Sequence, residues 1–282
     1  MPNKRDQNLQ IVNASGFPFQ LRIAEEIRCT PGRLGWEVIA EEHFWSDRNS
    51  GQSGFIDIVA GFGIVRLVIE CKRGAEATWI FLVRSSASPD GVSRVRALCT
   101  DRVEGESDIR LWADLMVSPN SPEAGYCVVR GQGDKEPMLE RVGATVLQSA
   151  EALADEELSL GKPPSISRLR VYVPVIITAA TLQVCRFDPI KVDINAGRLP
   201  AEAANFEAVP VVRFRKALSG SSDASQARDL DAARKENERT VLVVQAKAVT
   251  NVLESWDIKP SWGEQWPHSV AREGIRRIKR QG

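Results

Sequence analysis

Two neighbouring apolar runs with charged residues inside them constrain this chain most. They form the stretch "GFIDIVAGFGIVRLVIECKRG", residues 54–74, in which isoleucine, valine, leucine, alanine and glycine predominate. Such runs, joined by glycines, are typical of a buried β-hairpin. Asp57, Glu70 and Lys72 interrupt them, and an unpaired buried charge is costly or shifts its pKa. These charged side chains must therefore pair with one another or bind a ligand, and a metal site is one explanation.

The register of this hairpin decides whether the three charges meet. Side chains alternate between the two faces of a strand, so Glu70 and Lys72 share one face. A turn centred just after Gly63 sets Asp57 opposite Glu70. A three-residue turn centred on Phe62 would instead offset the two acids by about 10 Å, which is too far for one shared ion. We therefore predict the wider loop or a local bulge, for which the glycines are suited.

Two carboxylates supply the hard oxygen ligands that Mg²⁺ or Mn²⁺ prefers, and these ions take further ligands from water and substrate phosphate. Asp57 and Glu70 therefore favour phosphodiester chemistry. A cation held there would activate water and neutralise charge on the phosphate oxygens, while Lys72 would orient that water or stabilise the transition state. The alternative is a structural ion-pair cluster at the end of the sheet.

A first helix adds an independent clue. The stretch "FPFQLRIAEEIR", residues 17–28, predicts an amphipathic helix with Gln20 near the middle of its apolar face. Gln20 would thus face the sheet over the hairpin, where its carbonyl could serve the site or simply satisfy backbone groups. Glu25 and Glu26 turn outward, and we expect them to be solvated.

Five short motifs resemble, in the same order, those of the PD-(D/E)XK or restriction-endonuclease-like nucleases: "FQLRIA" (19–24), "GWEV" (35–38), "IDIVA" (56–60), "ECK" (70–72) and "WIFL" (79–82). The resemblance covers roughly residues 17–83. It implies an α/β fold with a restriction-endonuclease-like core, in which helices flank a central mixed β-sheet, with an insertion and a β-rich C-terminal extension.

The resemblance also implies a site and an activity. Asp57, Glu70 and the backbone carbonyl of Cys71 would bind Mg²⁺ or Mn²⁺. Lys72 would serve the attacking water, and Gln20 would assist from the helix. The chain would be an endo- or exodeoxyribonuclease that hydrolyses phosphodiester bonds of DNA, in restriction, phage defence or DNA processing, with RNA as an alternative substrate.

Two departures from the family pattern leave other functions open. Gln20 stands where such proteins often carry a glutamate, and Phe55 stands where many have an acidic residue. One alternative is a catalytically inactive, nuclease-like module that binds nucleic acid or a protein partner. Another is a nuclease that stays silent until a homodimer, a regulatory partner or a small-molecule signal assembles it.

The rest of the chain predicts further elements and boundaries. Residues 9–188 would form the nuclease core, with an insertion over the core at about 85–125, where one amphipathic piece interrupts a weak pattern. Residues 189–262 would form the β-rich extension, and residues 263–282 a basic tail. We expect a polar loop at 219–238. Further strands are expected at 35–45, 78–83, 126–131, 169–178, 182–188, 208–218 and 239–249, and helices at 136–158 and 250–256.

Composition limits the partners and the compartment. Lysine plus arginine equals aspartate plus glutamate at 37 each, so binding to DNA must come from local patches, for which Arg22, Arg73 and Arg84 are candidates. Five widely spaced cysteines without a CxxC pair favour a reduced cytoplasm. No stretch approaches the length of an apolar membrane span, so we expect no membrane partner.

Overall fold

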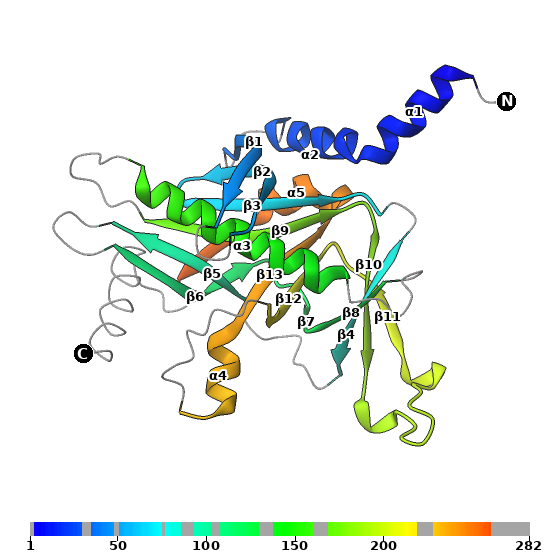
Figure 1. The fold of residues 1–282 in the computed structure, drawn as a ribbon. Coiled ribbons are helices and arrows are strands. Elements are labelled where there is room, and N and C mark those ends of the chain that lie inside the picture. The colour runs from blue at the N-terminus through cyan, green and yellow to red at the C-terminus, as the bar shows by residue number, and fades with distance from the viewer. Residues whose placement is uncertain are drawn as a thin grey trace.

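A computed structural model describes residues 3–29, 35–47, 51–74, 77–85, 93–102, 108–129, 138–160, 169–218 and 228–260. The chain folds as an α/β protein in which helices flank a mixed, ten-stranded sheet, and a four-stranded sheet adjoins it (Figure 1). The basic tail expected at residues 263–282 lies outside the described residues. No helix in the described part of the chain is both long enough and apolar enough to cross a membrane.

The large sheet contains β1 (Glu37–Ser46), β2 (Ser53–Phe62), β3 (Val65–Lys72), β5 (Arg94–Asp101), β6 (Ile109–Ser118), β7 (Glu123–Ala124), β9 (Arg170–Thr178), β12 (Val211–Ala217), β13 (Glu238–Gln245) and β14 (Asp257–Pro260). Its main order is β1–β2–β3–β9–β13–β12–β7, and β5, β6 and β14 branch from β9. Strands β3, β9 and β13 run parallel. Their carboxyl ends therefore meet at one edge of the sheet, which is where ligands commonly bind in α/β proteins.

Strand β9 changes its partner half-way along one edge. Tyr172 pairs with β5, whereas Val175 pairs with β13, so Pro174 lies where the partner changes. The N–H of Val171 bonds to the carbonyl of Ile64 on the β3 side, and by alternation the nitrogen of Pro174 faces the opposite edge. Proline has no N–H to donate. Pro174 therefore occupies the position on β9 at which no backbone hydrogen bond to a neighbouring strand is needed.

The smaller sheet contains β4 (Thr78–Arg84), β8 (Tyr126–Val129), β10 (Thr181–Phe187) and β11 (Asn205–Ala208), in the order β11–β10–β4–β8. Strand β10 begins three residues after β9 ends and pairs in parallel with β4. The chain thus crosses from the large sheet to the small one through a short connection, which brings the two sheets together.

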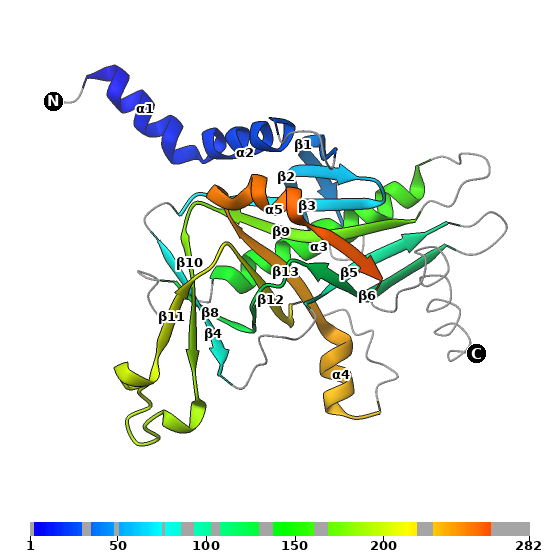
Figure 2. The same cartoon turned by 180° about the vertical axis from the view of Figure 1, so that it is seen from behind.

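The helices are α1 (Lys4–Ser15), α2 (Phe17–Cys29), α3 (Met138–Ser159), α4 (Leu230–Asn237) and α5 (Val249–Ser255), with short 3-10 helices η1 (Pro189–Lys191), η2 (Ala201–Ala203) and η4 (Ala246–Ala248). Helices α2 and α5 cover one face of the large sheet, and α3 crosses the other (Figures 1 and 2). Helix α1 buries no side chain and projects away from the sheets (Figure 1).

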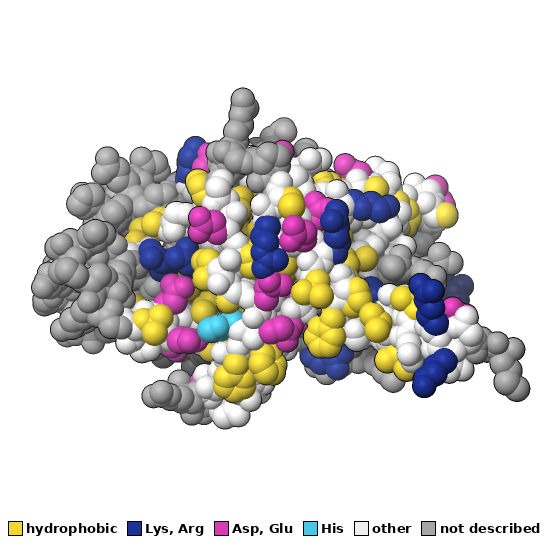
Figure 3. Space-filling model, turned by 90° about the horizontal axis from the view of Figure 1, so that it is seen from above, with side chains coloured by type: hydrophobic (Ala, Val, Ile, Leu, Met, Phe, Trp, Pro, Cys, Tyr) yellow, Lys and Arg dark blue, Asp and Glu magenta, His cyan; other side chains and the backbone are white. Residues whose placement is uncertain are grey.

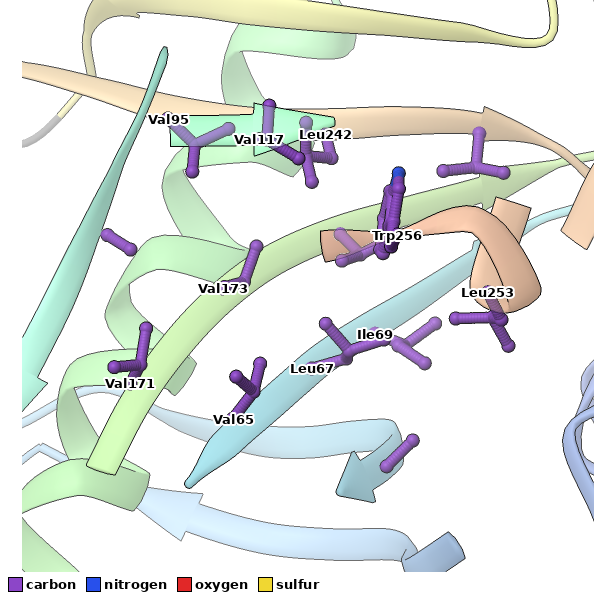
Figure 4. Close-up of a cluster of buried hydrophobic side chains, with 14 of the residues drawn as sticks. Val65, Leu67, Ile69, Val95, Val117, Val171, Val173, Leu242, Leu253 and Trp256 are labelled. Atoms are coloured by element: carbon purple, nitrogen blue, oxygen red, sulfur yellow. The ribbon is translucent and has the colours of Figure 1, made fainter. Parts of the chain in front are cut away.

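Each face of the sheet carries its own hydrophobic core. Under α2 and α5, Leu67 and Ile69 of β3 pack with Leu242 of β13, and Leu253 and Trp256 close the cluster (Figure 4). The core on the other face lies under α3 and extends to the smaller sheet. Strands buried on both faces read as near-continuous apolar runs, which explains the composition of β3 and β9.

The secondary structure expected from the sequence is largely confirmed. Helix α2, the two hairpin strands and the long helix α3 occur where the pattern predicts them. The other expected strands are β1, β4, β8, β9, β10, β12 and β13, and the expected short helix is α5. Their ends differ from the expected ones by a few residues, as is usual for boundaries.

Two segments differ from expectation. In the described parts of the segment at about 85–125, β5 and β6 extend the large sheet from β9 instead of lying over the core. The amphipathic piece forms β6, in which Leu111 faces one core and Trp112 the other. Within the expected polar loop, α4 forms because the carboxylate of Asp229 caps it by accepting the N–H of Ala232, at 2.8 Å.

Residues of the expected C-terminal extension share the large sheet with the expected core. Strand β13 pairs directly with β9, and β12 pairs with β13. The buried side chains of β13 enter both hydrophobic cores. The α/β architecture with a mixed sheet and flanking helices is therefore built from both parts of the chain.

Candidate active site

The β2–β3 hairpin brings the two acids close. Ile58 pairs with Ile69 and Phe62 with Val65, so a two-residue turn follows Phe62. Asp57 and Glu70 are the next residues along the two strands beyond these pairs, and the charge of Glu70 acts on the Asp57 carboxyl. The turn is centred just after Gly63, as the sequence analysis predicts, and it is tight rather than wide. Gly63 has φ +55°, which suits the first central position of a two-residue hairpin turn.

A side-chain hydrogen bond joins the two strands where their backbone pairing stops. The backbone N–H of Cys71 donates to Oδ2 of Asp57 at 2.6 Å. The Asp57 carboxylate therefore takes the place of a backbone acceptor on β2. Because the N–H and the C=O of one strand residue point to the same side, the carbonyl of Cys71 faces the same edge as Asp57.

Lys72 lies beside Glu70 as an ion pair. Its ammonium donates to Oε1 of Glu70, and the side chains are 36% and 17% exposed. Both residues lie at the carboxyl end of β3, where Lys72 is opposite Thr178 of β9. A partly buried pair is screened less by salt than a surface pair.

Burial and neighbouring charge change the acidity of this cluster. Burial, followed by the negative charge of Glu70, raises the pKa of Asp57 to about 6. The N–H of Cys71 and the ammonium of Lys72 act in the opposite direction. Burial also raises the pKa of the Cys71 thiol well above its usual value, so this thiol stays protonated and is no nucleophile.

Gln20 faces the hairpin from α2, as expected, but its contacts differ in kind. The side chain is 6% exposed, and its amide nitrogen donates to Oε1 of Glu42 and to the backbone carbonyl of Asp57, the latter at 3.1 Å. The amide thus supports the backbone of Asp57. The predicted role of its carbonyl toward a ligand stays a prediction.

Glu42 is the residue that the sequence analysis missed. It lies in β1, between residues paired with Ile56 and Ile58, and has φ +50°. Left-handed backbone is uncommon for residues other than glycine, and such outliers gather at functional sites. Its carboxylate also contributes to the raised pKa of Asp57. The only sequence signal is a pair of glutamates, Glu41 and Glu42, inside an otherwise alternating strand.

The three candidate DNA-binding arginines lie on different elements and have different partners. Arg22 is paired with Glu26 on α2, Arg73 donates to the carbonyl of Asn13, and Arg84 ends β4 in the smaller sheet. On the face seen from above, basic and acidic side chains are interspersed among hydrophobic ones (Figure 3). These arginines stay a prediction as a nucleic-acid surface.

The donor set fits a hard divalent cation. Within the described ranges, Oδ1 of Asp57 and Oε2 of Glu70 have no hydrogen-bond or ion-pair partner. A cation between the two carboxylates would relieve the repulsion that raises the pKa of Asp57. Among the described residues, no three His, Cys, Asp or Glu side chains are grouped to hold a metal. The remaining ligands would therefore be backbone, water or substrate oxygens, which Mg²⁺ accepts.

Comparisons of the chain with protein-family models, curated proteins and solved structures give no match. The chemistry of the site must therefore be argued from its own geometry.

Proposed function

We propose that this chain is a metal-dependent nuclease with a restriction-endonuclease-like core, and that it hydrolyses phosphodiester bonds of DNA. One observation carries the proposal: Asp57 and Glu70 lie close enough at the end of the β2–β3 pairing for the charge of Glu70 to act on Asp57, with Lys72 paired to Glu70 beside them. The site lies at the carboxyl end of parallel strands, between α2 on one face and α3 on the other. The order of the five sequence motifs supports the same assignment.

Each residue has a role that follows from its position. Asp57, Glu70 and the carbonyl of Cys71 would hold Mg²⁺ or Mn²⁺ through oxygen atoms. When bound, the cation would supply positive charge to the phosphate oxygens and make water a better nucleophile. Lys72 would donate a hydrogen bond to the attacking water or to a phosphate oxygen. Gln20 would hold the backbone of Asp57 in place.

Plasmid cleavage tests this proposal. Supercoiled DNA is incubated with Mg²⁺ or Mn²⁺ and the wild-type protein, Asp57→Asn, Glu70→Gln or Lys72→Met. Each substitution removes a charge that acts on the reacting groups, so we expect losses of about a hundredfold or more. Glu202→Gln, an exposed acid on η2, is the matched control and should cleave like the wild type.

Calorimetry with Mn²⁺ separates the alternatives. A wild type that binds Mn²⁺ through Asp57 and Glu70 but cleaves no DNA is a nuclease awaiting assembly by a partner or a signal. A wild type that binds DNA but neither binds Mn²⁺ nor cleaves is the inactive, nuclease-like module, and that result would overturn the proposal.

A further inference from the structure

A large cavity lies apart from the candidate active site. It has a volume of about 770 Å³ and lies between the two sheets and α5, within the size range of small-molecule sites. Its walls come from β4, β5, β10, β12, α5 and the segments beside β7 and β11. Gln20, Asp57, Glu70 and Lys72 do not line it.

One wall of the cavity is held rigidly by Arg213 of β12. Its side chain is 10% exposed, donates twice to the carbonyl of Ser121, at 3.1 and 2.9 Å, and pairs with Glu123 at 2.7 Å. The backbone N–H of Ser121 in turn donates to Oγ of Ser93 at 3.0 Å. These bonds preorganise the segment that precedes β7, so a ligand would not have to order it.

Two further arginines are available to a ligand. Arg94 lines the cavity, and its guanidinium makes no ion pair with any described residue. Arg186 is 3.6 Å from Glu207, and these side chains are 27% and 57% exposed. An exposed, long ion pair contributes little, so an incoming anion can replace Glu207. Planar guanidinium groups bind carboxylate and phosphate through two parallel hydrogen bonds.

The cavity lining contains four arginines and two acidic residues, Glu123 and Glu207. Arg215 is already neutralised by Asp114 and Glu238, outside the lining. Burial lowers the pKa of Arg213, Glu123 offsets only part of this effect, and the nearby charge of Arg215 adds a smaller lowering. An anion in the cavity would therefore meet a positive charge that is incompletely compensated.

Part of the lining is apolar. Val209 and Val211 on one side and Val252 and Trp256 on the other contribute to the lining. A ligand that is only a small anion would leave these surfaces wet, whereas an attached ring or apolar chain would cover them.

We propose that this cavity binds a small organic anion, in which a phosphate or carboxylate group contacts Arg94 and Arg186 and an apolar ring packs against Val252 and Trp256. The site is independent of the nuclease proposal, because it uses none of the residues of the candidate active site.

Binding is tested on the full-length protein without metal, by saturation-transfer NMR and calorimetry. The ligands are adenosine 5′-monophosphate and phenyl phosphate as ring phosphates, 3-phenylpropionate as a ring carboxylate, and adenosine and inorganic phosphate as matched halves. We expect a ring anion to bind at least tenfold more tightly than either half. The phosphate and carboxylate arms identify which anion the arginines prefer.

Charge reversal locates the ligand. Arg94→Glu and Arg186→Glu should each weaken binding at least tenfold, whereas Arg141→Glu, on the exposed face of α3, should bind like the wild type. Arg94→Ala and Arg186→Ala repeat the test without a new charge, and circular dichroism verifies the fold. The proposal is overturned if no ring anion binds the wild type at about 1 mM, or if the two arginine sites and the control behave alike.

Discussion

Asp57 couples the stability of the metal-free protein to pH. Its folded pKa, about 6, lies above the ordinary value of 3.8, so the folded state holds a proton that the unfolded state has released between these values. This stabilising contribution is complete below about pH 4 and is lost as the pH rises through 6. At neutral pH the ionised carboxylate beside Glu70 destabilises the empty site.

Asp57→Asn should remove this dependence. Measured by urea unfolding in EDTA, the variant should gain about 1 to 3 kcal/mol relative to the wild type between pH 4 and pH 8, because each pKa unit corresponds to about 1.4 kcal/mol. Asparagine keeps an oxygen for the N–H of Cys71. An unchanged difference between wild type and variant across this range would contradict the raised pKa.

The backbone at Glu42 predicts an unusual order of substitutions. At φ +50°, valine is strained and glycine is not, so Glu42→Val should be less stable than Glu42→Gly by about 1 kcal/mol. At Glu37, which begins the same strand with an ordinary backbone, the order should reverse, because valine suits strands better than glycine does. Chemical denaturation of the four variants decides this, and the same order at both positions would exclude strain at Glu42.

Sequence alternation predicts individual positions when the strand is regular and fails when it is not. A period of two places Glu70 and Lys72 side by side on β3, where they form an ion pair. The sequence did not identify Glu42 as a site residue, because its role depends on a left-handed backbone conformation that no local sequence pattern predicts. The contact of Gln20 with the backbone of Asp57 likewise depends on how α2 docks, which sequence periodicity does not specify.

A side-chain hydrogen bond links the ends of β5 and β13 along the edge of β9. The N–H of Arg96 donates to Oγ1 of Thr240 at 3.0 Å, and both residues are buried. No backbone ladder satisfies this N–H, because the two strands follow one another along β9 rather than pairing. Thr240 therefore completes the junction.

Thr240→Val should destabilise the protein by about 1 to 3 kcal/mol, since it leaves a buried N–H without an acceptor at nearly constant volume. Thr145→Val provides the control, because the Thr145 hydroxyl is exposed on α3 and bonds only within its own helix. That change should stay within about 0.5 kcal/mol. Equal effects in guanidinium unfolding would show that the junction needs no hydroxyl.

Periodicity also predicts secondary-structure elements better than it predicts which of these elements contact one another. The stripe on α3 and the apolar runs of β9 and β13 identify them, but the partner change on β9 and the transfer of β4 to the smaller sheet depend on contacts distant in sequence. Strand β6 was missed because it is buried on both faces, so its pattern resembles neither a half-buried strand nor a surface helix. Helix α4 was missed because polar pairing and a cap, rather than an apolar face, support it.

Both cores of the large sheet depend on the C-terminal part of the chain. Leu242 and Val244 of β13 enter the core under α2, and Val241 and Val243 enter the core under α3. Both hydrophobic cores therefore contain residues from before and after residue 188, so the two parts of the chain do not have separate cores.

A protein truncated after residue 188 should fail to fold. Without β13, the distal half of β9 becomes an exposed apolar edge, which promotes aggregation. We expect insoluble protein, or a product without a cooperative thermal transition by calorimetry, and recovery of soluble protein when residues 189–282 are coexpressed as a separate chain. A soluble, cooperatively folding truncated protein would instead indicate an autonomous core with an added extension.

The two-residue turn after Phe62 determines how β2 and β3 align, and thereby the relative position of Asp57 and Glu70. These acids lie about 20 Å from the turn, at about 3.3 Å per residue. Slipping the hairpin by one residue would separate Asp57 from Glu70 and would also rotate Leu67 and Ile69 out of their core, because every side chain changes face. Alignment of the acids and burial of the strand are thus protected by the same constraint. Over evolutionary time, the proposed site is expected to change by exchange of its side chains, not by drifting out of alignment.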